Sequence, residues 1–304
     1  MVVYEHMEQL TELRKPVYWA MGFFDGVHPG HRRVMAAAHH PGALCGVLTF
    51  DRHPLALLRP EAAPLLLTPD ADYKAELIES LGGADVLLRL PFTAELAAME
   101  PEAFLDALGE ACSIAGVSVG ANWRFGRAGR GTPELLGQLA AARGYAASVQ
   151  ELAVEQGAPV SSSRIRKELS AGRLHAANEL LGRPFAISGV VEHGQKLARQ
   201  LGFPTANICV PRHAALPPYG VYRVQCRVGG EWLAGVANIG LRPTIQEKTK
   251  ITRLEVHFPG WHGDLYGQRL TVELLDFIRL ERIFPSIDAL QQQMLSDIER
   301  ISKH

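Results

Sequence analysis

The sequence predicts two structural classes in one chain, an α/β half with a parallel sheet and then an antiparallel β half that ends in a helix. Short apolar runs alternate with Ala/Leu-rich amphipathic stretches as far as residue 182, and strand-like runs joined by Gly-rich turns follow it. The chain has 304 residues, which is enough for two domains at roughly 150 residues each. We therefore expect one domain at residues 1–182 and a second at residues 183–304.

The first half contains apolar runs that we interpret as strands, at residues 17–21, 44–50, 84–90 and 114–120. Amphipathic segments between and after them predict helices at residues 31–40, 69–82, 101–112 and 133–144. Gly144 closes the last of these as a helix C-cap would. Two short helices punctuated by Gly172 and Gly182 end this half. The alternation predicts a doubly wound parallel sheet.

The second half has strand-like runs at residues 185–194, 220–230, 231–240, 253–258 and 268–280, with no helix-length segment between them. This pattern predicts a compact antiparallel barrel. A last segment, residues 286–303, has the spacing of a helix laid on that barrel, with Ser286 as its N-cap. Its apolar positions are Ile287, Leu290, Met294, Leu295, Ile298 and Ile301.

The composition excludes several classes of protein. Hydrophobic residues make up 47% and charged residues 21%, which is typical of a globular chain and not of a disordered one. The formal net charge is −1, so we expect no nucleic acid partner. The longest stretch without Asp, Glu, Lys or Arg runs from residue 34 to residue 50, too short to span a membrane. Protein partners stay unknown at this stage.

The amino terminus and the cysteines bear on the compartment. Glu5, Glu8 and Glu12 lie where a secretion signal needs an apolar core, so we expect the protein to stay in the cytoplasm. The cysteines are widely spaced and form no CxxC pair, a usage that suits a reducing compartment and predicts neither a disulfide frame nor a zinc site. They are Cys45, Cys112, Cys209 and Cys226.

The first strand of the α/β half leads into GFFDGVHPGH at residues 22–31, and a helix follows. A strand, a Gly-rich loop and a helix in this order point backbone N–H groups at an anion. His28 and His31 are one helical turn apart, so both imidazoles can donate hydrogen bonds to one phosphate in a transition state. Alone, two histidines near a helix start are more often a turn residue and a surface residue.

A second segment of this half, SSSRIR at residues 161–166, starts a predicted helix with Ser162 and Ser163. These hydroxyls can cap the helix or bind phosphate oxygens, and the residues alone leave both open. Arg164 and Arg166 lie in the first turn, where they oppose the helix dipole and favour a bound anion.

The barrel half has its own polar segment, HGQKLARQLGFPTANI at residues 193–208. Thr205 and Asn207 offer the hard oxygen ligands that Mg²⁺ accepts beside nucleotide phosphates, although PTAN can also be a simple turn. Glu255 and His257 alternate with apolar residues of a predicted strand, on a face that can be the open mouth of the barrel. Glu255 there can accept a proton from an attacking hydroxyl, or can be a solvated charge.

These motifs together resemble the bacterial bifunctional riboflavin kinase/FAD synthetase family, whose first domain belongs to the nucleotidylyltransferase superfamily. GFFDGVHPGH is similar to the (H/T)xGH motif of that superfamily, and SSSRIR is similar to the SSTxIR stretch of the family. HGQKLARQLGFPTANI resembles the GxxxGRxLGFPTAN segment of the riboflavin kinase domain. Further blocks in the family's order are LTFDRHPL, TPDADYKAELIESLG, LPFTAELAAMEPEAFL, VGANWRFGRAGRGT, NIGLRPT, DLYG and FIRLERIF.

The resemblance implies a Rossmann-like adenylyltransferase domain, a riboflavin kinase barrel, and two reactions that use ATP with Mg²⁺. Riboflavin would be phosphorylated to FMN, and FMN would then be adenylylated to FAD with release of pyrophosphate. It implies Glu255, His28 and His31 as catalytic residues and Thr205 and Asn207 as metal ligands. The ATP and phosphate contacts it implies are Gly22, Asp25, Gly26, Gly30, Ser162, Ser163, Arg166, Gly194, Lys196 and Thr205. The flavin contacts it implies are Asn122, Arg124, Phe125, Arg279 and Phe284.

Four positions depart from the family pattern. Phe23 stands where the family usually has a small polar residue, Arg52 replaces a Pro, Ser163 replaces a Thr and Ala198 replaces a Gly. Phe23 leaves a second interpretation open, in which the chain is a riboflavin kinase whose adenylyltransferase half is impaired. A third is a flavin-binding regulatory module without turnover. The functional groups of His28 and Glu255 are intact and favour the two-reaction enzyme.

Overall fold

The computed structural model describes residues 1–193, 202–243 and 250–301. The chain divides into two compact units, one formed by Met1–Leu66 with Ala71–Ser162 and the other by Leu67–Asp70 with Ser163–His304. The first unit is the predicted α/β half, and the second contains the predicted barrel. The contacts within the chain group residues 163–182 with the barrel. The domain boundary between residues 182 and 183 stays a prediction.

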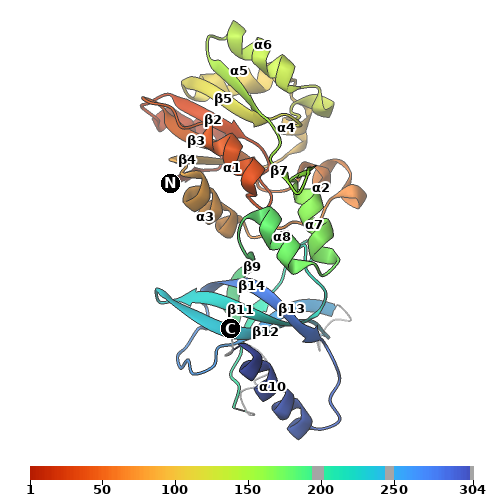
Figure 1. Ribbon diagram of the computed structural model, residues 1–304. Helices are drawn as coiled ribbons and strands as arrows, with labels where there is room; N and C mark the ends of the chain where they lie inside the picture. The colour runs from red at the N-terminus through yellow and green to blue at the C-terminus, as the bar shows by residue number, and fades with distance from the viewer. Residues whose placement is uncertain (194–201, 244–249, 302–304) are drawn as a thin grey trace. The chain divides into compact units, whose positions relative to one another are not determined.

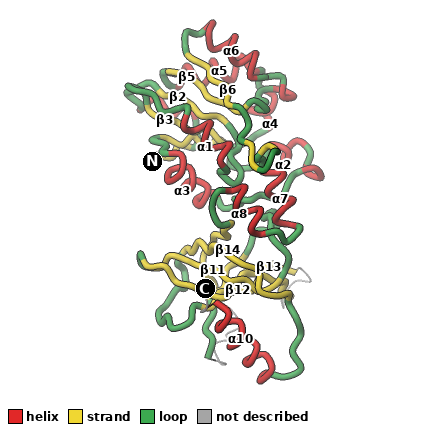
Figure 2. The backbone as a smooth tube through the Cα atoms, viewed as in Figure 1, coloured by secondary structure: helices red, strands yellow, loops and turns green. Residues whose placement is uncertain are grey.

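The first unit is built on a parallel sheet of six strands (Figures 1 and 2). All neighbouring strands are parallel, as predicted. Their order in the sheet is β1 (Val2–Tyr4), β4 (Val86–Leu90), β3 (Leu44–Phe50), β2 (Val17–Met21), β5 (Ile114–Gly120) and β6 (Ala146–Gln150).

The predicted strands β2, β3 and β5 have the bounds that the sequence indicates, and every residue of β2 is buried. Strands β1 and β6, which form the two edges of the sheet, were not predicted from the sequence. An edge strand packs less of its surface, so its apolar pattern is weak: three of the five residues of β6 are exposed, and Val2 of β1 is 54% exposed. Central strands are therefore the ones that hydrophobic runs reveal.

Helices separate the strands, and four of the six α-helices begin at a proline. In three of these four, the side chain of the residue before the proline caps the helix. The α-helices of this unit are α1 (Pro29–Ala36), α2 (Pro54–Leu58), α3 (Ala71–Gly82), α4 (Ala94–Ala98), α5 (Pro101–Ala111) and α6 (Pro133–Ala142), and the 3-10 turns are η1 (Met7–Glu12), η2 (Pro60–Ala62) and η3 (Arg127–Gly129). A short hairpin of β7 (Val154–Glu155) and β8 (Ala158–Pro159) precedes the end of the unit. Gly144 has φ +78°, which confirms its place after the end of α6.

The second unit contains a closed barrel of six strands in which every neighbouring pair is antiparallel, as predicted. Around the barrel the order is β10 (Ala206–Cys209), β13 (Lys250–His257), β12 (Glu231–Pro243), β11 (Gly220–Val228), β14 (Arg269–Leu280) and β9 (Phe185–Glu192). Two helices, α7 (Ser162–Ser170) and α8 (Leu174–Leu181), precede β9, and α10 (Ile287–Ile301) ends the described chain.

The interpretation of residues 204–207 as a turn is partly wrong, because Ala206 and Asn207 begin β10. The strand is only four residues long and starts after a proline, so its sequence carries a stronger turn signal than strand signal. Pairing on both sides, with β9 and β13, overrides that local signal.

Helix α10 lies against the barrel, as Figure 1 shows, and Ser286 caps it by accepting a hydrogen bond from the backbone N–H of Ala289 at 3.2 Å. Its predicted apolar face is partly wrong. Leu290, Met294 and Ile298 face the barrel, whereas Ile287 and Leu295 are more than half exposed. The buried Asp297 takes a place on the inner face that the apolar pattern did not predict. Among the described helices, none is long and apolar enough to cross a membrane.

Candidate functional sites

The Gly-rich segment of the first unit lies where the strand order reverses. The chain passes from β2 to β3 and β4 on one side, and then returns to β5 and β6 on the other side of β2. Parallel strands end at one edge, so the segment after β2 and the loop after β5 leave the sheet side by side. Open α/β sheets bind their ligands in the crevice at such a reversal.

The segment between β2 and α1 has an unusual backbone. Phe24 has φ +55° and Val27 has φ +41°, values in the left-handed region that residues with a side chain seldom adopt. Gly26, with φ +83°, lies between them in the sequence. Strain of this kind persists where the surrounding structure holds the chain, and it is concentrated at ligand sites. Phe24 and Val27 are almost fully buried, and their packing holds the turn.

His28 and His31 lie together at the end of this segment. His28 caps α1, accepting a hydrogen bond at Nδ1 from the backbone N–H of His31 at 3.4 Å. Their rings are stacked, with centroids 3.6 Å apart and planes 19° from parallel. A Cβ atom on Gly30 would lie 3.2 Å from the His28 ring, so a side chain there would crowd the pair. The structure therefore brings the two predicted imidazoles to one place beside the helix start.

The carboxyl end of this unit is fastened to the same segment. Ser162, the first residue of α7, donates a hydrogen bond from its hydroxyl to the backbone carbonyl of Asp25 at 2.8 Å. The Asp25 side chain is only 3% exposed. The next residue, Ser163, is exposed and accepts a hydrogen bond from Arg166 Nη2 at 3.1 Å. Ser162 is thus held against the Gly-rich segment, and Ser163 forms a hydroxyl–guanidinium pair with Arg166.

The loop after β5 contains the predicted flavin contacts of this unit. Asn122 and Arg124 are exposed. Phe125 is 8% exposed and packs in the core, stacked on Trp123 at 4.5 Å between centroids and tilted against Phe104 at 6.1 Å. Of the three, Asn122 and Arg124 present their side chains to solvent, and the Phe125 ring lies within the core cluster.

In the barrel, the register between neighbouring strands brings polar side chains together. On β13, Glu255 is opposite Asn207 of β10 on one side and opposite Asn238 of β12 on the other. Side chains of directly paired residues point to the same face of a sheet, so these three lie on one face. Leu254 and Val256 alternate with Glu255 and have no exposed surface. Glu255 therefore lies on the outer wall beneath α10, and the prediction of an open barrel mouth is wrong.

Two cavities of this unit meet at Thr205. The first has a volume of about 370 Å³, and its polar lining includes Thr205, Asn207 and Asp264. The second has a volume of about 290 Å³, lies between the barrel wall and α10, and is lined by Thr205 together with Glu255, Asn238, Arg279, Phe284 and Met294. Thr205 thus borders both spaces, an arrangement that suits transfer of a group from a ligand in one to a ligand in the other.

Asn207 is suited to a metal ion. Its side chain is 5% exposed, and Oδ1 is buried with no hydrogen-bond partner among the described residues. Its Nδ2 donates to the carbonyl and the hydroxyl of Thr205 at 3.3 and 3.4 Å, which fixes the side-chain orientation. A buried oxygen without a partner is costly unless a ligand satisfies it. The oxygens of Asn207 and Thr205 therefore fit a hard divalent cation.

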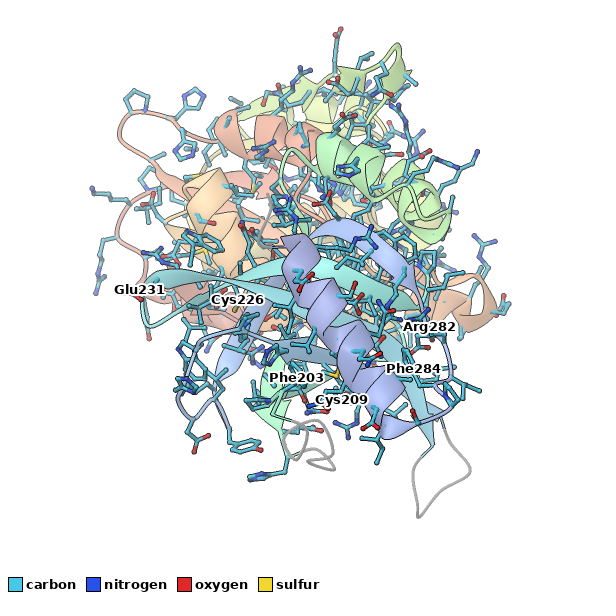
Figure 3. The ribbon with its side chains drawn as sticks, turned by 60° about the horizontal axis from the view of Figure 1, so that its bottom comes forward. Phe203, Cys209, Cys226, Glu231, Arg282 and Phe284 are labelled. Carbon is cyan, nitrogen blue, oxygen red and sulfur yellow. The ribbon has the colours of Figure 1, made fainter. Side chains whose placement is uncertain are left out.

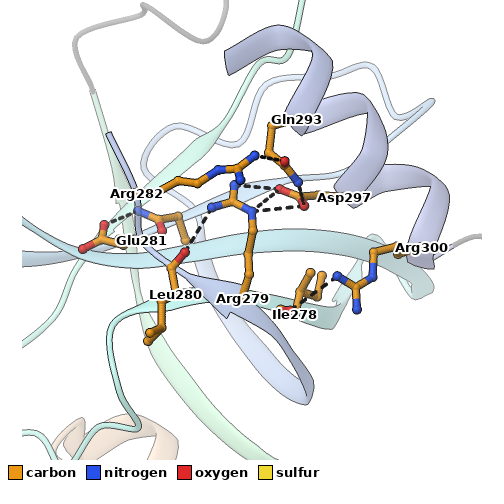
Figure 4. A network of polar contacts seen from close by, with 9 residues as sticks. Ile278, Arg279, Leu280, Glu281, Arg282, Gln293, Asp297 and Arg300 are labelled. Carbon is orange, nitrogen blue, oxygen red and sulfur yellow. Dashed lines mark hydrogen bonds and ion pairs between the residues drawn. The ribbon is translucent and has the colours of Figure 1, made fainter. Parts of the chain in front are cut away.

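A network of charged side chains lines the second cavity, and Figure 4 shows the polar contacts within this network. Arg279 donates from Nη2 and Nε to Asp297 of α10 at 2.7 and 3.0 Å, and Asp297 is 2% exposed. The Phe284 ring lies 4.8 Å from the guanidinium of Arg282, and Figure 3 shows both residues beside α10. Asn238 donates to Glu281 at 2.9 Å. The predicted contacts Arg279 and Phe284 are thus placed with Glu255 around one cavity.

Two of the predicted residues, Gly194 and Lys196, and the departure at Ala198 lie outside the described residues. The departure at Arg52 is on the surface, where Arg52 pairs with Asp51 at 3.0 Å. The departure at Phe23 is half-buried. Its ring lies 4.0 Å from Lys74 Nζ and meets the His53 ring edge-on, with centroids 4.9 Å apart.

Comparisons with known proteins agree with this division of the chain. A family model described as FAD synthetase matches residues 10–164, and one described as riboflavin kinase matches residues 181–304. Proteins named bifunctional riboflavin kinase/FMN adenylyltransferase are similar over almost the whole chain. The chain belongs to this family.

Individual relatives give the extent of the similarity. The family member of Bacillus subtilis is 36% identical over 283 residues, covering 91% of this chain and 89% of its own. The member of Listeria monocytogenes is 34% identical over 294 residues, covering 95% and 92%. A solved structure described as a macrolide-efflux protein from Streptococcus pneumoniae superposes over both whole chains with a TM-score of 0.85 and 24% identity, which shows the shared fold alone.

Three further residues belong to these sites and were not predicted as site residues: Lys74, Asn238 and Asp297. Asn238 and Asp297 become part of the second cavity only through strand register and helix packing. Lys74 did leave a signal, because it lies on the apolar face of α3, where Leu77 and Ile78 follow it three and four residues later and all three are buried. A lysine at a core-facing helix position is rare without a functional reason.

Proposed function

We propose that this chain phosphorylates riboflavin to FMN in the barrel unit and adenylylates FMN to FAD in the α/β unit, using ATP in both steps. One observation carries the proposal: each unit gathers its own set of polar residues that can bind a phosphate. In the α/β unit it is the stacked pair of His28 and His31 on a strained loop. In the barrel it is Glu255, register-paired with Asn207 beside Thr205, which borders both cavities.

In the kinase step, Glu255 accepts the proton of the riboflavin 5′-hydroxyl as that oxygen attacks the γ-phosphorus of ATP, the bond to the β,γ-bridging oxygen breaks, and ADP leaves. The flavin occupies the cavity lined by Arg279 and Phe284, and the nucleotide phosphates lie on the other side of Thr205. Thr205 and Asn207 would hold Mg²⁺, which when bound would neutralise charge on the transferring phosphoryl group. The buried Oδ1 of Asn207, which has no hydrogen-bond partner within the described part of the chain, supports this assignment.

In the adenylylation step, the FMN phosphate attacks the α-phosphorus of ATP and pyrophosphate leaves. His28 and His31 donate hydrogen bonds to the α-phosphate oxygens, where negative charge is redistributed in the transition state. The N–H groups of the Gly-rich segment cradle the phosphates, and the hydroxyls of Ser162 and Ser163 with Arg166 bind the leaving pyrophosphate. Asn122 and Arg124 contact the flavin.

Two alternatives differ from the proposal in their products. A kinase with an impaired adenylyltransferase half would stop at FMN, and a flavin-binding regulatory protein would form neither product. Phe23 motivates the first, yet its ring contacts Lys74 and His53, and His28 and His31 remain stacked beside the loop. The stacked histidines beside the loop favour the enzyme with both reactions.

A single assay separates the three. The full chain is incubated with riboflavin, ATP and Mg²⁺, and the flavins are resolved by chromatography. We expect FMN to appear first and FAD to follow, with pyrophosphate released in step with FAD. FMN alone would support the kinase, and unchanged riboflavin would support the regulatory module. We further propose that the protein acts in the cytoplasm, because its four cysteines carry free thiols, which a reducing compartment preserves.

A further inference from the structure

A lysine is buried beneath the Gly-rich segment of the α/β unit. Lys74 of α3 is 6% exposed, and its Nζ donates a hydrogen bond to Thr49 Oγ1 at 2.9 Å. The same Nζ lies 4.0 Å from the centroid of the Phe23 ring, over its face. Among the described residues, the contacts of this ammonium are thus one neutral hydroxyl and one aromatic ring. A lysine is almost never fully buried without a carboxylate to pair it.

The lysine is connected to the phosphate segment through that hydroxyl. Thr49 has one hydroxyl hydrogen, which it donates to the backbone carbonyl of Phe23 at 2.9 Å, so it accepts the hydrogen bond from Lys74. Phe23 lies between β2 and α1 within the segment that leads to His28. The ammonium is therefore held directly under the turn at which we propose that ATP phosphates bind.

The electrostatic setting makes the charge of Lys74 sensitive to a ligand. Burial lowers the pKa of Lys74 from its ordinary value to about 7, and the Arg89 guanidinium lowers it further, whereas Asp25 and Asp51 oppose the shift. Asp25 acts on Lys74 from the Gly-rich segment, Arg89 acts from β4, and Asp51 acts from the residue after β3. The His53 ring meets the Phe23 ring edge-on. Near neutral pH the amine is therefore partly uncharged.

We propose that Lys74 takes up a proton when a polyphosphate binds to the Gly-rich segment, so that the nucleotide itself creates the positive charge that holds it. This inference rests on the proposed adenylyltransferase activity and adds a residue to that site. A polyanion nearby in a poorly solvated place favours the ammonium strongly over the neutral amine. Lys74 is then a residue that positions and stabilises the triphosphate through its charge, and the Phe23 ring shields it while the site is empty.

The sign of the pH effect follows from linkage. In the free protein Lys74 has a pKa of about 7, and bound polyphosphate raises it. Below pH 7 both states are protonated and Lys74 adds no pH dependence. As the pH rises above 7, the free protein loses the proton first, so affinity falls by up to about tenfold per pH unit until the bound-state pKa is reached.

The test uses the full chain and inorganic pyrophosphate with Mg²⁺, since ATP would also bind to the kinase site. Calorimetric titrations at pH 8 in two buffers of different ionisation enthalpy give the number of protons taken up. We expect wild type to take up roughly one proton more per bound pyrophosphate than Lys74→Met. Lys74→Arg, which keeps a permanent charge, should bind with an affinity that is flatter between pH 7 and 9 than that of wild type.

Controls separate this role from a structural one. Lys15→Met, at an exposed lysine of the same unit, should behave as wild type. Lys74→Met should unfold at a higher temperature than wild type at pH 6.5, because a buried charge is removed, and its riboflavin kinase rate should be unchanged. Phe23→Asn, which opens Lys74 to water, should reduce proton uptake without removing the lysine.

Equal proton uptake by wild type and Lys74→Met would overturn the proposal. So would a Phe23→Asn variant with undiminished uptake, which decides the matter even where Lys74→Met does not fold. Either result would leave the proposed function intact as long as wild type converts FMN to FAD. Absence of FAD from wild type would instead remove the adenylyltransferase function on which this inference rests.

Discussion

The two candidate sites hold their polar groups by different means. In the α/β unit, His28 and His31 come from a single short segment, and strained backbone at Phe24 with glycine packing brings their rings into contact. In the barrel, Glu255 and Asn207 come from distant parts of the chain and lie together because β13 pairs with β10 in one register. The first site depends on local backbone conformation, and the second depends on strand pairing.

This difference determines which structural changes disrupt each site. A change in the local segment alters the phosphate cradle and leaves the sheet in place. A slip of one residue in β13 would send Glu255 to the barrel interior and its apolar neighbours to the outer wall. The apolar residues Leu254 and Val256, both with no exposed surface, oppose such a slip. The barrel site is therefore protected by the same burial that stabilises the fold.

The largest expected effect comes from removing the proposed base of the barrel site. Glu255→Gln should lower the rate of FMN formation by about 10²-fold or more, because the amide cannot accept the proton of the attacking hydroxyl. FAD formation from supplied FMN should be unchanged, which is measured separately with FMN and ATP.

A matched control for that variant is Glu273→Gln on β14, a barrel glutamate that accepts a hydrogen bond from Gln225 at 2.6 Å and does not line the cavity. It should retain the kinase rate. If Glu255→Gln keeps the wild-type rate as well, Glu255 is not the base. The barrel site is then not built on the pairing of β13 with β10.

The next effect concerns the local site. His28→Ala should lower the turnover of FAD formation by roughly 10- to 100-fold, because one donor to the α-phosphate is lost, and FMN formation should be unchanged. His31→Ala should act in the same direction. Turnover is measured at saturating ATP, and His40→Ala, at an exposed histidine stacked on Tyr18, is the control. Normal turnover with weakened ATP binding would show that the histidines bind only the ground state.

Much of the fold could be predicted because the segments that the fold buries are rich in apolar residues. Strands β2, β3 and β5 are central and rich in buried apolar residues, and their predicted bounds match the observed ones. Ser286 and Gly144 marked helix ends by their chemistry. Strands β1 and β6 at the sheet edges and the four-residue β10 carry little burial pattern, so their existence depends on neighbours that the sequence does not reveal.

The sites show the same contrast. The pairing of His28 with His31 could be predicted, because both lie within one turn of α1. The place of Glu255 under α10 could not, because a period of two assigns a residue to a face without saying what covers that face. Lys74 approaches the Gly-rich segment from a different helix, and only the packing of α3 brings it within 4.0 Å of Phe23.

A smaller effect sharpens the role of α10 in the barrel site. Asp297→Ala removes the carboxylate that orients Arg279, and should raise the KM for riboflavin about tenfold with a smaller change in kcat. Breaking a largely buried ion pair should also lower the free energy of unfolding by about 3 kcal/mol. Glu299→Ala, at an exposed carboxylate two residues later in α10, is the control. An unchanged KM would show that the Arg279–Asp297 pair only fastens the helix.

The smallest effect tests how independent the two sites are and where their boundary lies. The contact-based units place α8 with the barrel, and Asn178 of α8 makes two hydrogen bonds to it. It donates to the carbonyl of Leu274 at 3.1 Å and accepts from the backbone N–H of Phe185 at 2.8 Å. A fragment of residues 163–304 keeps both bonds, and a fragment of residues 183–304 loses them.

Both fragments should phosphorylate riboflavin within a few-fold of the full chain, because Thr205, Asn207 and Glu255 are present in each. The shorter one should be less stable by about 1–3 kcal/mol, the net contribution of two hydrogen bonds, with the lost packing of α8 added to it. Urea unfolding measures the difference, and Asn178→Ala in the longer fragment should reproduce the hydrogen-bond part. Equal stability of the two fragments would support the boundary at residue 182. The longer fragment could instead fold cooperatively, form no FMN, and recover activity when it is mixed with residues 1–162. That result would show that the barrel site needs the α/β unit, and that the two sites do not bind phosphate independently.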